Sequence, residues 1–163
     1  MKTLVAYYSL GGNTKSVAER VARSLRSDVI EIKTVKEYPD DYDVLLSLGE
    51  KEVASGYIPA IRPVEIDWDK YDAVLLGTPV WFGSFAPAMK KFMSIYKWRE
   101  KVVYPFVTNG GTIGHVIGDF RKALRGAYIG PVLNVKFEDD EQITPDLVIK
   151  DWMTIIKDGR IKD

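Results

Sequence analysis

Short apolar runs alternate along the chain with segments whose apolar residues recur at helical spacing. Each run is short and is bounded by polar or turn-forming residues, which predicts strands buried in the core. The five predicted strands span residues 3–8, 28–33, 72–77, 101–108 and 129–137. Apolar positions three or four residues apart predict helices in the intervening segments. The apolar faces of these helices fall within residues 17–25, 40–53, 89–96, 116–124 and 145–156.

The alternation of strands and helices predicts an α/β fold with a doubly wound parallel sheet. Strands that are apolar along their whole length suit such a sheet, because helices cover both of its faces. Right-handed crossovers then favour five parallel strands in the order 2-1-3-4-5, within a single domain over residues 1–163. Pro105 lies inside the fourth predicted strand. Because proline has no backbone N–H group, we expect a bulge or a broken ladder at this position.

The connection between the second and third predicted strands is longer than one crossover helix requires. Residues 40–53 are predicted to be helical, with Val44, Leu45 and Leu48 facing the core. Residues 55–63 contain two prolines and one glycine and are therefore predicted to form a loop. Long ordered loops are often functional. Packing over the surface is nevertheless the more common role, and we favour it for this loop.

The composition excludes several classes of function. The 163 residues carry 23 basic and 23 acidic side chains, and a net charge of zero provides no basic field for nucleic acid. The absence of cysteine excludes disulfides, thiolate metal sites and cysteine nucleophiles, and a single histidine excludes multi-histidine metal sites. The first apolar run is too short for a signal peptide, and no later run could span a membrane. We therefore expect a cytoplasmic protein without nucleic-acid, membrane or metal binding.

The loop after the first predicted strand has the composition of a phosphate-binding turn. Ligands of an open parallel sheet bind beyond the carboxyl ends of the strands where the strand order reverses, here between the first and third strands. Gly11 and Gly12 allow a tight turn into a helix whose free N–H groups suit a phosphate dianion. Ser9, Asn13 and Thr14 add side-chain donors, although an ordinary capped turn is the alternative. The P-loop motif and the G-x-G-x-x-G dinucleotide motif are both absent.

Two further loops follow the third and fourth predicted strands and should meet the first. Residues 77–87 contain Trp81 and Phe82, and exposed rings at this place predict a planar ligand that stacks on them. The alternative is that the rings pack beneath the following helix, which we favour for Phe85. Residues 108–115 hold three glycines and could present backbone amides to the edge of a heterocycle.

Residues 8–14, 77–83 and 108–111 together resemble the FMN-binding loops of flavodoxin-like proteins, and the resemblance extends over nearly the whole chain. It implies a flavodoxin-like fold with FMN as cofactor. The phosphate contacts that it implies come from Ser9, Gly11, Gly12, Asn13 and Thr14. The implied ring contacts come from Pro79, Val80, Trp81 and Phe82 on one side, and from Thr108, Asn109, Gly110 and Gly111 on the other side and the pyrimidine edge. The predicted cofactor site also includes Leu10, Thr78 and Gly83.

The three loops contain no acidic residue, in contrast to the strongly acidic flavodoxins that carry electrons. Carboxylates near a flavin oppose the negative charge of its reduced form, by roughly 4 kcal/mol at 4 Å and intermediate dielectric. Their absence from residues 1–18, 77–99 and 101–118 predicts a flavin that is easier to reduce fully. Acidic residues also form the face that attracts basic partners. The acidic residues 138–141 are predicted to form a solvated loop elsewhere.

Two redox functions follow from the implied cofactor. An electron-transfer protein would exchange electrons with a partner protein or with a small-molecule donor or acceptor. An NAD(P)H-dependent FMN oxidoreductase would reduce a quinone or another small acceptor, and residues 55–63, with Tyr57 and Arg62, could frame this second ligand. The electron-transfer protein is favoured slightly over the enzyme, and a module that binds another nucleotide without redox chemistry is favoured least.

His115 is the only histidine of the chain. It could lie near the pyrimidine end of the flavin and stabilise the reduced anion, or it could act as a donor to a bound substrate. The alternative is a partly exposed residue in the first turn of a helix, which we favour.

Overall fold

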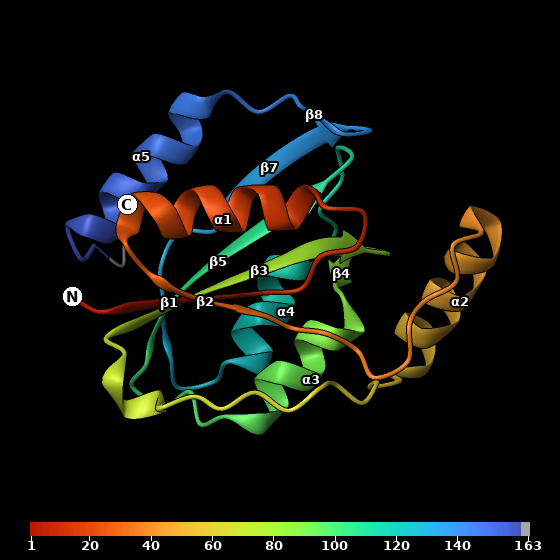
Figure 1. Cartoon of the computed structure of the whole chain (residues 1–163), viewed down its shortest axis with the longest axis horizontal. Coiled ribbons are helices and arrows are strands. Elements are labelled where there is room, and N and C mark those ends of the chain that lie inside the picture. The colour runs from red at the N-terminus through yellow and green to blue at the C-terminus, as the bar shows by residue number, and fades with distance from the viewer. Residues whose placement is uncertain (161–163) are drawn as a thin grey trace.

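A twisted sheet of mainly parallel strands runs through the molecule, with helices on both of its faces (Figure 1). The computed structural model describes residues 1–160, so the last three residues of the predicted domain lie outside the described residues. The main strands lie in the order β2-β1-β3-β5-β7 and span Asp28–Glu31, Thr3–Tyr7, Ala73–Trp81, Val102–Asn109 and Leu133–Glu138. All neighbouring pairs in this order are parallel. The predicted α/β fold and its strand order 2-1-3-4-5 are therefore confirmed.

The described residues form three additional two-residue strands, of which β4 and β8 were not predicted and β6 overlaps the start of the fifth predicted strand. β4 (Ser84–Phe85) pairs antiparallel with β3, and β8 (Glu141–Gln142) pairs antiparallel with β7. β6 (Tyr128–Ile129) pairs in parallel with the first residues of β5. A single 3-10 turn, η1 (Trp68–Lys70), precedes β3. β4 and β8 lie at the carboxyl edge of the sheet, where they shape the candidate site.

Four helices cover the two faces of the sheet. α1 (Asn13–Leu25) and α5 (Asp146–Lys157) lie on one face, and α3 (Pro87–Ile95) and α4 (Val116–Ala123) lie on the other (Figure 1). Successive strand residues point to opposite faces, so each strand contributes to two cores. Val5 belongs to the core beneath α1 and α5, whereas Leu4 belongs to the core beneath α3 and α4.

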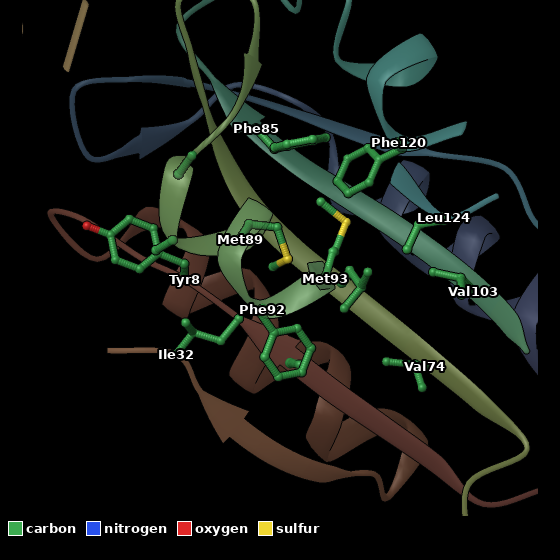
Figure 2. Close-up of a cluster of buried hydrophobic side chains, with 14 of the residues drawn as sticks. Tyr8, Ile32, Val74, Phe85, Met89, Phe92, Met93, Val103, Phe120 and Leu124 are labelled. Atoms are coloured by element: carbon green, nitrogen blue, oxygen red, sulfur yellow. The ribbon is translucent and has the colours of Figure 1, made fainter. Parts of the chain in front are cut away.

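The core beneath α3 and α4 extends to the carboxyl edge of the sheet (Figure 2). Met89 and Phe92 of α3 pack with Phe120 of α4 and with Leu124 at the C-cap of that helix, and all four side chains are fully buried. Tyr8, directly after β1, belongs to the same core. The start of the loop after β1 is therefore anchored in a tightly packed core, which holds the backbone of this part of the candidate site in place.

The helix α2 (Tyr42–Ser55) lies beyond the carboxyl ends of the strands rather than on a sheet face (Figure 1). The predicted inward face of this helix is therefore wrong: Val44 is 53% exposed, Leu48 is 36% exposed, and only Leu45 is partly buried. Between α2 and β3, three apolar side chains from the segment after the helix pack against the core instead. They are Ile61, Ile66 and Trp68.

Strand β5 passes through Pro105 in unbroken register with β3, so the expected bulge does not occur in this strand. The predicted break in the ladder is found on its other side. There β5 pairs with β6 over its first two residues and with β7 only from Phe106 onward. The predicted strand over residues 129–137 is consequently two strands. They separate at Gly130, where a Cβ atom would lie 2.4 Å from the Tyr104 ring.

Strand β3 continues to Trp81 instead of ending at Gly77, so part of the predicted loop is an extended strand. The chain then returns as β4 through Phe82 and Gly83. Both turn residues have positive φ angles, 49° and 80°, as in a two-residue type I′ hairpin. We call residues 80–85 the β3–β4 hairpin. It projects beyond the sheet beside α2 (Figure 1).

Candidate cofactor-binding site

The loop after β1 leads directly into the N-terminus of α1. Gly11 and Gly12 have φ angles of 79° and 99°, which side chains disfavour, and Gly12 is the N-cap of the helix. The Ser9 hydroxyl accepts a hydrogen bond of 3.1 Å from the Lys15 amide and so closes the turn. The first turn of α1 contains no acidic side chain, so the positive end of the helix dipole remains available to an anion.

Thr14 connects this loop to the end of β5. Its buried hydroxyl lies 2.7 Å from the hydroxyl of Thr108, which is also buried. The hydrogen bond fixes the start of α1 against the strand that carries the third predicted loop. The first and third loops therefore meet at the carboxyl edge of the sheet, as the predicted strand order requires.

A hollow of about 240 Å³ lies where the loops meet, and we call it the cofactor pocket. It brings together eight of the predicted site residues from all three loops: Leu10, Asn13, Pro79, Val80, Trp81, Thr108, Asn109 and Gly110. The other predicted residues do not line this hollow. Ser9, Gly11, Gly12 and Thr14 shape its first loop, as described above. The remaining four predicted residues, Thr78, Phe82, Gly83 and Gly111, support or shape the second and third loops.

Thr78 is fully buried and supports the hairpin. Its hydroxyl donates to the Pro79 carbonyl at 2.9 Å and accepts from the Ala86 amide at 3.0 Å. Gly111 donates its amide N–H to the Asn109 side chain at 2.9 Å, which shapes the third loop. Phe82 and Gly83 form the turn of the β3–β4 hairpin, outside the cofactor pocket.

Two residues of the cofactor pocket, Phe137 and Asp139, were missed by the sequence analysis. They lie at the end of β7 and in the turn before β8, and the Asp139 carbonyl accepts a 2.9 Å hydrogen bond from the Asn13 side chain. The sequence held a signal for these two residues, because all parallel strands end at the same edge of the sheet. The residues at the end of the fifth predicted strand could therefore have been expected near the site. Residues 138–141 are exposed, as expected, but Glu138 ends β7 and Glu141 begins β8, so only the two residues between them form a turn. Asp139 also brings an acidic residue to the pocket, which the three acid-free loops did not predict.

Trp81 is held edge-on by two tyrosines. The ring centroids of Tyr8 and Tyr38 lie 6.0 Å and 5.1 Å from that of Trp81, and both pairs are close to perpendicular. The Tyr38 hydroxyl donates to the buried Glu52 carboxylate of α2 at 2.7 Å. Burial, together with the nearby Glu52 charge, raises the pKa of Tyr8 and of Tyr38 above the usual tyrosine value, so both hydroxyls keep their protons. The contacts therefore link α2 to one wall of the cofactor pocket.

His115 lies outside the cofactor pocket, at the N-cap position of α4 with a side chain that is 69% exposed. Its Nδ1 atom lies 2.5 Å from Asp119 Oδ2, and the same oxygen accepts a 2.6 Å hydrogen bond from the Ser84 hydroxyl. The His115 amide also donates to the Gly83 carbonyl at 2.8 Å. These contacts hold the β3–β4 hairpin against α4, which is a structural role.

The cofactor pocket fits a molecule that has a phosphate at one end and a planar ring system at the other. The N-terminus of α1 and the Asn13 side chain provide hydrogen-bond donors on one side. Pro79, Val80 and Trp81 provide an apolar wall on another side, and Asn109 and Gly110 offer polar groups at the edge. Within residues 1–160, no three acidic, histidine or cysteine side chains lie together as a metal site would require. Over the same residues, no helix combines the length and apolarity needed to cross a membrane.

Known proteins with related folds include FMN-containing flavoproteins and flavodoxins. A flavoprotein from Lactobacillus acidophilus, solved in complex with FMN, is 28% identical to this chain and has a TM-score of 0.74. The comparison covers 82% of this chain and 92% of that protein. Oxidised flavodoxin 2 from Bacillus cereus shares the fold with a TM-score of 0.60 at 17% identity, over 98% of this chain and 99% of that one.

Curated relatives include a protein from Syntrophobacter fumaroxidans that is named NAD(P)H dehydrogenase (quinone). It is 32% identical over 97 residues, which cover 57% of this chain and 47% of that protein. A protein of the same name from Geobacter sulfurreducens is 31% identical over 97 residues, with the same coverage of both chains. The matched region thus spans about half the length of these relatives.

The family model for flavodoxin matches residues 2–155, which is almost the whole chain. This match agrees with the strand order, with the loops at the carboxyl edge of the sheet and with the solved structures of similar fold. The family predicted from the three loops is confirmed, and the chain belongs to the flavodoxin family.

Proposed function

We propose that the protein binds FMN in the cofactor pocket and transfers electrons through it. The observation that carries this proposal is that all three predicted loops line one hollow beside the N-terminus of α1. The loop of residues 9–14 would hold the phosphate, and Pro79, Val80 and Trp81 would lie against the ring. Bound FMN supplies the ability to accept and donate electrons singly or in pairs, and the chain supplies binding, orientation and exclusion of water.

The surface around the cofactor pocket supports transfer to a partner protein with a basic face. Asp40, Asp41 and Asp43 are exposed at the start of α2, next to Tyr42. The exposed acidic residues 138–141 lie on the β7–β8 side, where Asp139 lines the pocket. Acidic side chains thus lie beside Asp139 of the pocket and beside Tyr42, which lines a hollow adjoining the pocket, although the loops lack them, and this arrangement would attract and orient a basic partner. We place this exchange in the cytoplasm, where reduced nucleotides and redox proteins occur together.

The second candidate is an NAD(P)H-dependent FMN oxidoreductase that reduces a quinone or another small acceptor. One structural observation favours it: an apolar groove between α2 and the β3–β4 hairpin adjoins the cofactor pocket. The names of the curated relatives agree with such an activity, although this chain spans only about half of their length.

Titration of the purified protein with FMN tests the cofactor. Binding should quench the fluorescence of the flavin and perturb that of the tryptophans, with a defined stoichiometry of one. Spectra that stay unchanged on addition of FMN would contradict both redox functions.

Oxidation of NADH and NADPH by the FMN-loaded protein then separates the two candidates. An electron-transfer protein should show negligible turnover with a quinone until a separate reductase is added. Substantial turnover without a reductase would favour the oxidoreductase.

A further inference from the structure

A second hollow, of about 320 Å³, lies between α2 and the β3–β4 hairpin, and we call it the α2 groove. None of the side chains that line it carries a formal charge. They are Leu10, Tyr42, Leu45, Leu46, Val80, Trp81 and Phe82, together with the backbone of Gly49. Leu46 is 41% exposed and Phe82 is 44% exposed, so the groove is open to solvent.

The α2 groove depends on Gly49 and Phe82. A Cβ atom at Gly49 would lie 3.1 Å from the Phe82 ring and 3.7 Å from the Trp81 ring, so the glycine lets the helix approach the hairpin closely. Glycine inside a helix is destabilising relative to alanine, and the close approach gives a packing reason for glycine at this position. Phe82 adopts a positive φ angle of 49°, a conformation that phenylalanine disfavours, and its ring forms one wall of the groove.

The α2 groove and the cofactor pocket share three lining residues: Leu10, Val80 and Trp81. A ligand in the groove would therefore be separated from a cofactor in the pocket by no more than these side chains.

We propose that the α2 groove binds a neutral, planar aromatic ligand of the quinone class. The inference rests on the second candidate of the proposed function, the oxidoreductase, because it gives the small acceptor of that reaction a place beside FMN. The uncharged lining disfavours an ionic ligand, which would have to give up its hydration without a partner charge. The Tyr42 hydroxyl and the Trp81 indole N–H are hydrogen-bond donors, and they match a ligand whose polar atoms are carbonyl oxygens.

Calorimetric titration of the FMN-loaded protein with 2-methyl-1,4-naphthoquinone tests this proposal, with methyl NMR shifts to locate the ligand. Saturable binding should shift the methyl resonances of Leu10, Leu45 and Leu46. Leu46→Glu places a carboxylate in the groove and should raise the quinone dissociation constant by about tenfold or more. Leu147→Glu is the matched control, because Leu147 is 64% exposed on the distant α5 and the variant should bind the quinone like the parent protein.

Tyr42→Phe provides a second, milder variant, since Tyr42 is 70% exposed and only its hydroxyl is removed. It should weaken quinone binding by about fivefold, the effect of one hydrogen bond. Both variants should bind FMN with unchanged affinity, because neither residue lines the cofactor pocket. If FMN binding fails while the quinone still binds in the groove, the proposed function fails and the groove assignment stands.

Three results would overturn the assignment. The first is the absence of saturable quinone binding, and the second is binding that Leu46→Glu leaves unchanged. The third is a dimer of the parent protein that dissociates on Leu46→Glu in sedimentation experiments, because the α2 groove would then be an interface between two copies of the chain.

Discussion

At the scale of single residues, Trp81 is the side chain that connects the parts of the site. It lines both the cofactor pocket and the α2 groove, and Tyr8 and Tyr38 support its ring edge-on. Trp81→Ala should weaken FMN binding by about 1–3 kcal/mol, by analogy with nucleic-acid bases that stack on aromatic side chains. Fluorescence titration measures this loss, and Tyr128→Ala is the control because its exposed ring lies in β6, away from the site. An unchanged dissociation constant would remove Trp81 from the ring site.

The Tyr38 hydroxyl is a second residue-scale feature, since it is the donor that satisfies the buried Glu52 carboxylate. Tyr38→Phe keeps the ring against Trp81 but leaves this carboxylate without its donor, which costs about 1–3 kcal/mol. We expect faster hydrogen exchange of the backbone amides of α2, by about fivefold or more, measured by mass spectrometry. Tyr57→Phe is the control, because Tyr57 is half exposed. Equal protection of α2 in both variants would show that the hydrogen bond does not hold the helix.

At the scale of elements, Asp119 of α4 positions the β3–β4 hairpin. One of its carboxylate oxygens contacts both Ser84 in β4 and His115 at the start of α4. Asp119→Ala should lower the free energy of unfolding by about 1–3 kcal/mol and should also weaken FMN binding, because the hairpin carries Trp81. Chemical denaturation and FMN titration measure the two effects, with Asp151→Ala on the exposed side of α5 as the control. Loss of stability with parental FMN affinity would mean that Asp119 supports the fold but not the site.

The placement of α2 shows where prediction from the sequence reaches its limit. Strands such as residues 72–77 were predictable because both faces of a parallel strand are buried. Such a strand is therefore a continuous apolar run, which is visible in the sequence. The loops at the carboxyl edge followed from strand order, which brought Asn13, Trp81 and Asn109 together as expected. Leu48, by contrast, has helical spacing that suits a sheet-covering helix, yet the sheet face is already covered by Ile61, Ile66 and Trp68. Competition between two apolar segments for one face depends on three-dimensional packing and leaves no local signal.

At the scale of the whole molecule, the net charge of zero conceals an uneven distribution. The acid-free loops predicted a flavin that is easy to reduce, but the β7–β8 turn brings Asp139 to the cofactor pocket. An exposed carboxylate within several ångströms opposes added negative charge by about 1 kcal/mol, which is roughly 40 mV for one electron. Asp139→Asn should therefore raise the midpoint potential for full reduction by tens of millivolts in a reductive titration, and added salt should diminish the shift. Asp140→Asn removes an equal charge from the next residue, which does not line the pocket, and should shift the potential less. Equal shifts in the two variants would mean that the acidic turn acts through its overall charge, and that the position of Asp139 in the pocket has no special effect on the flavin.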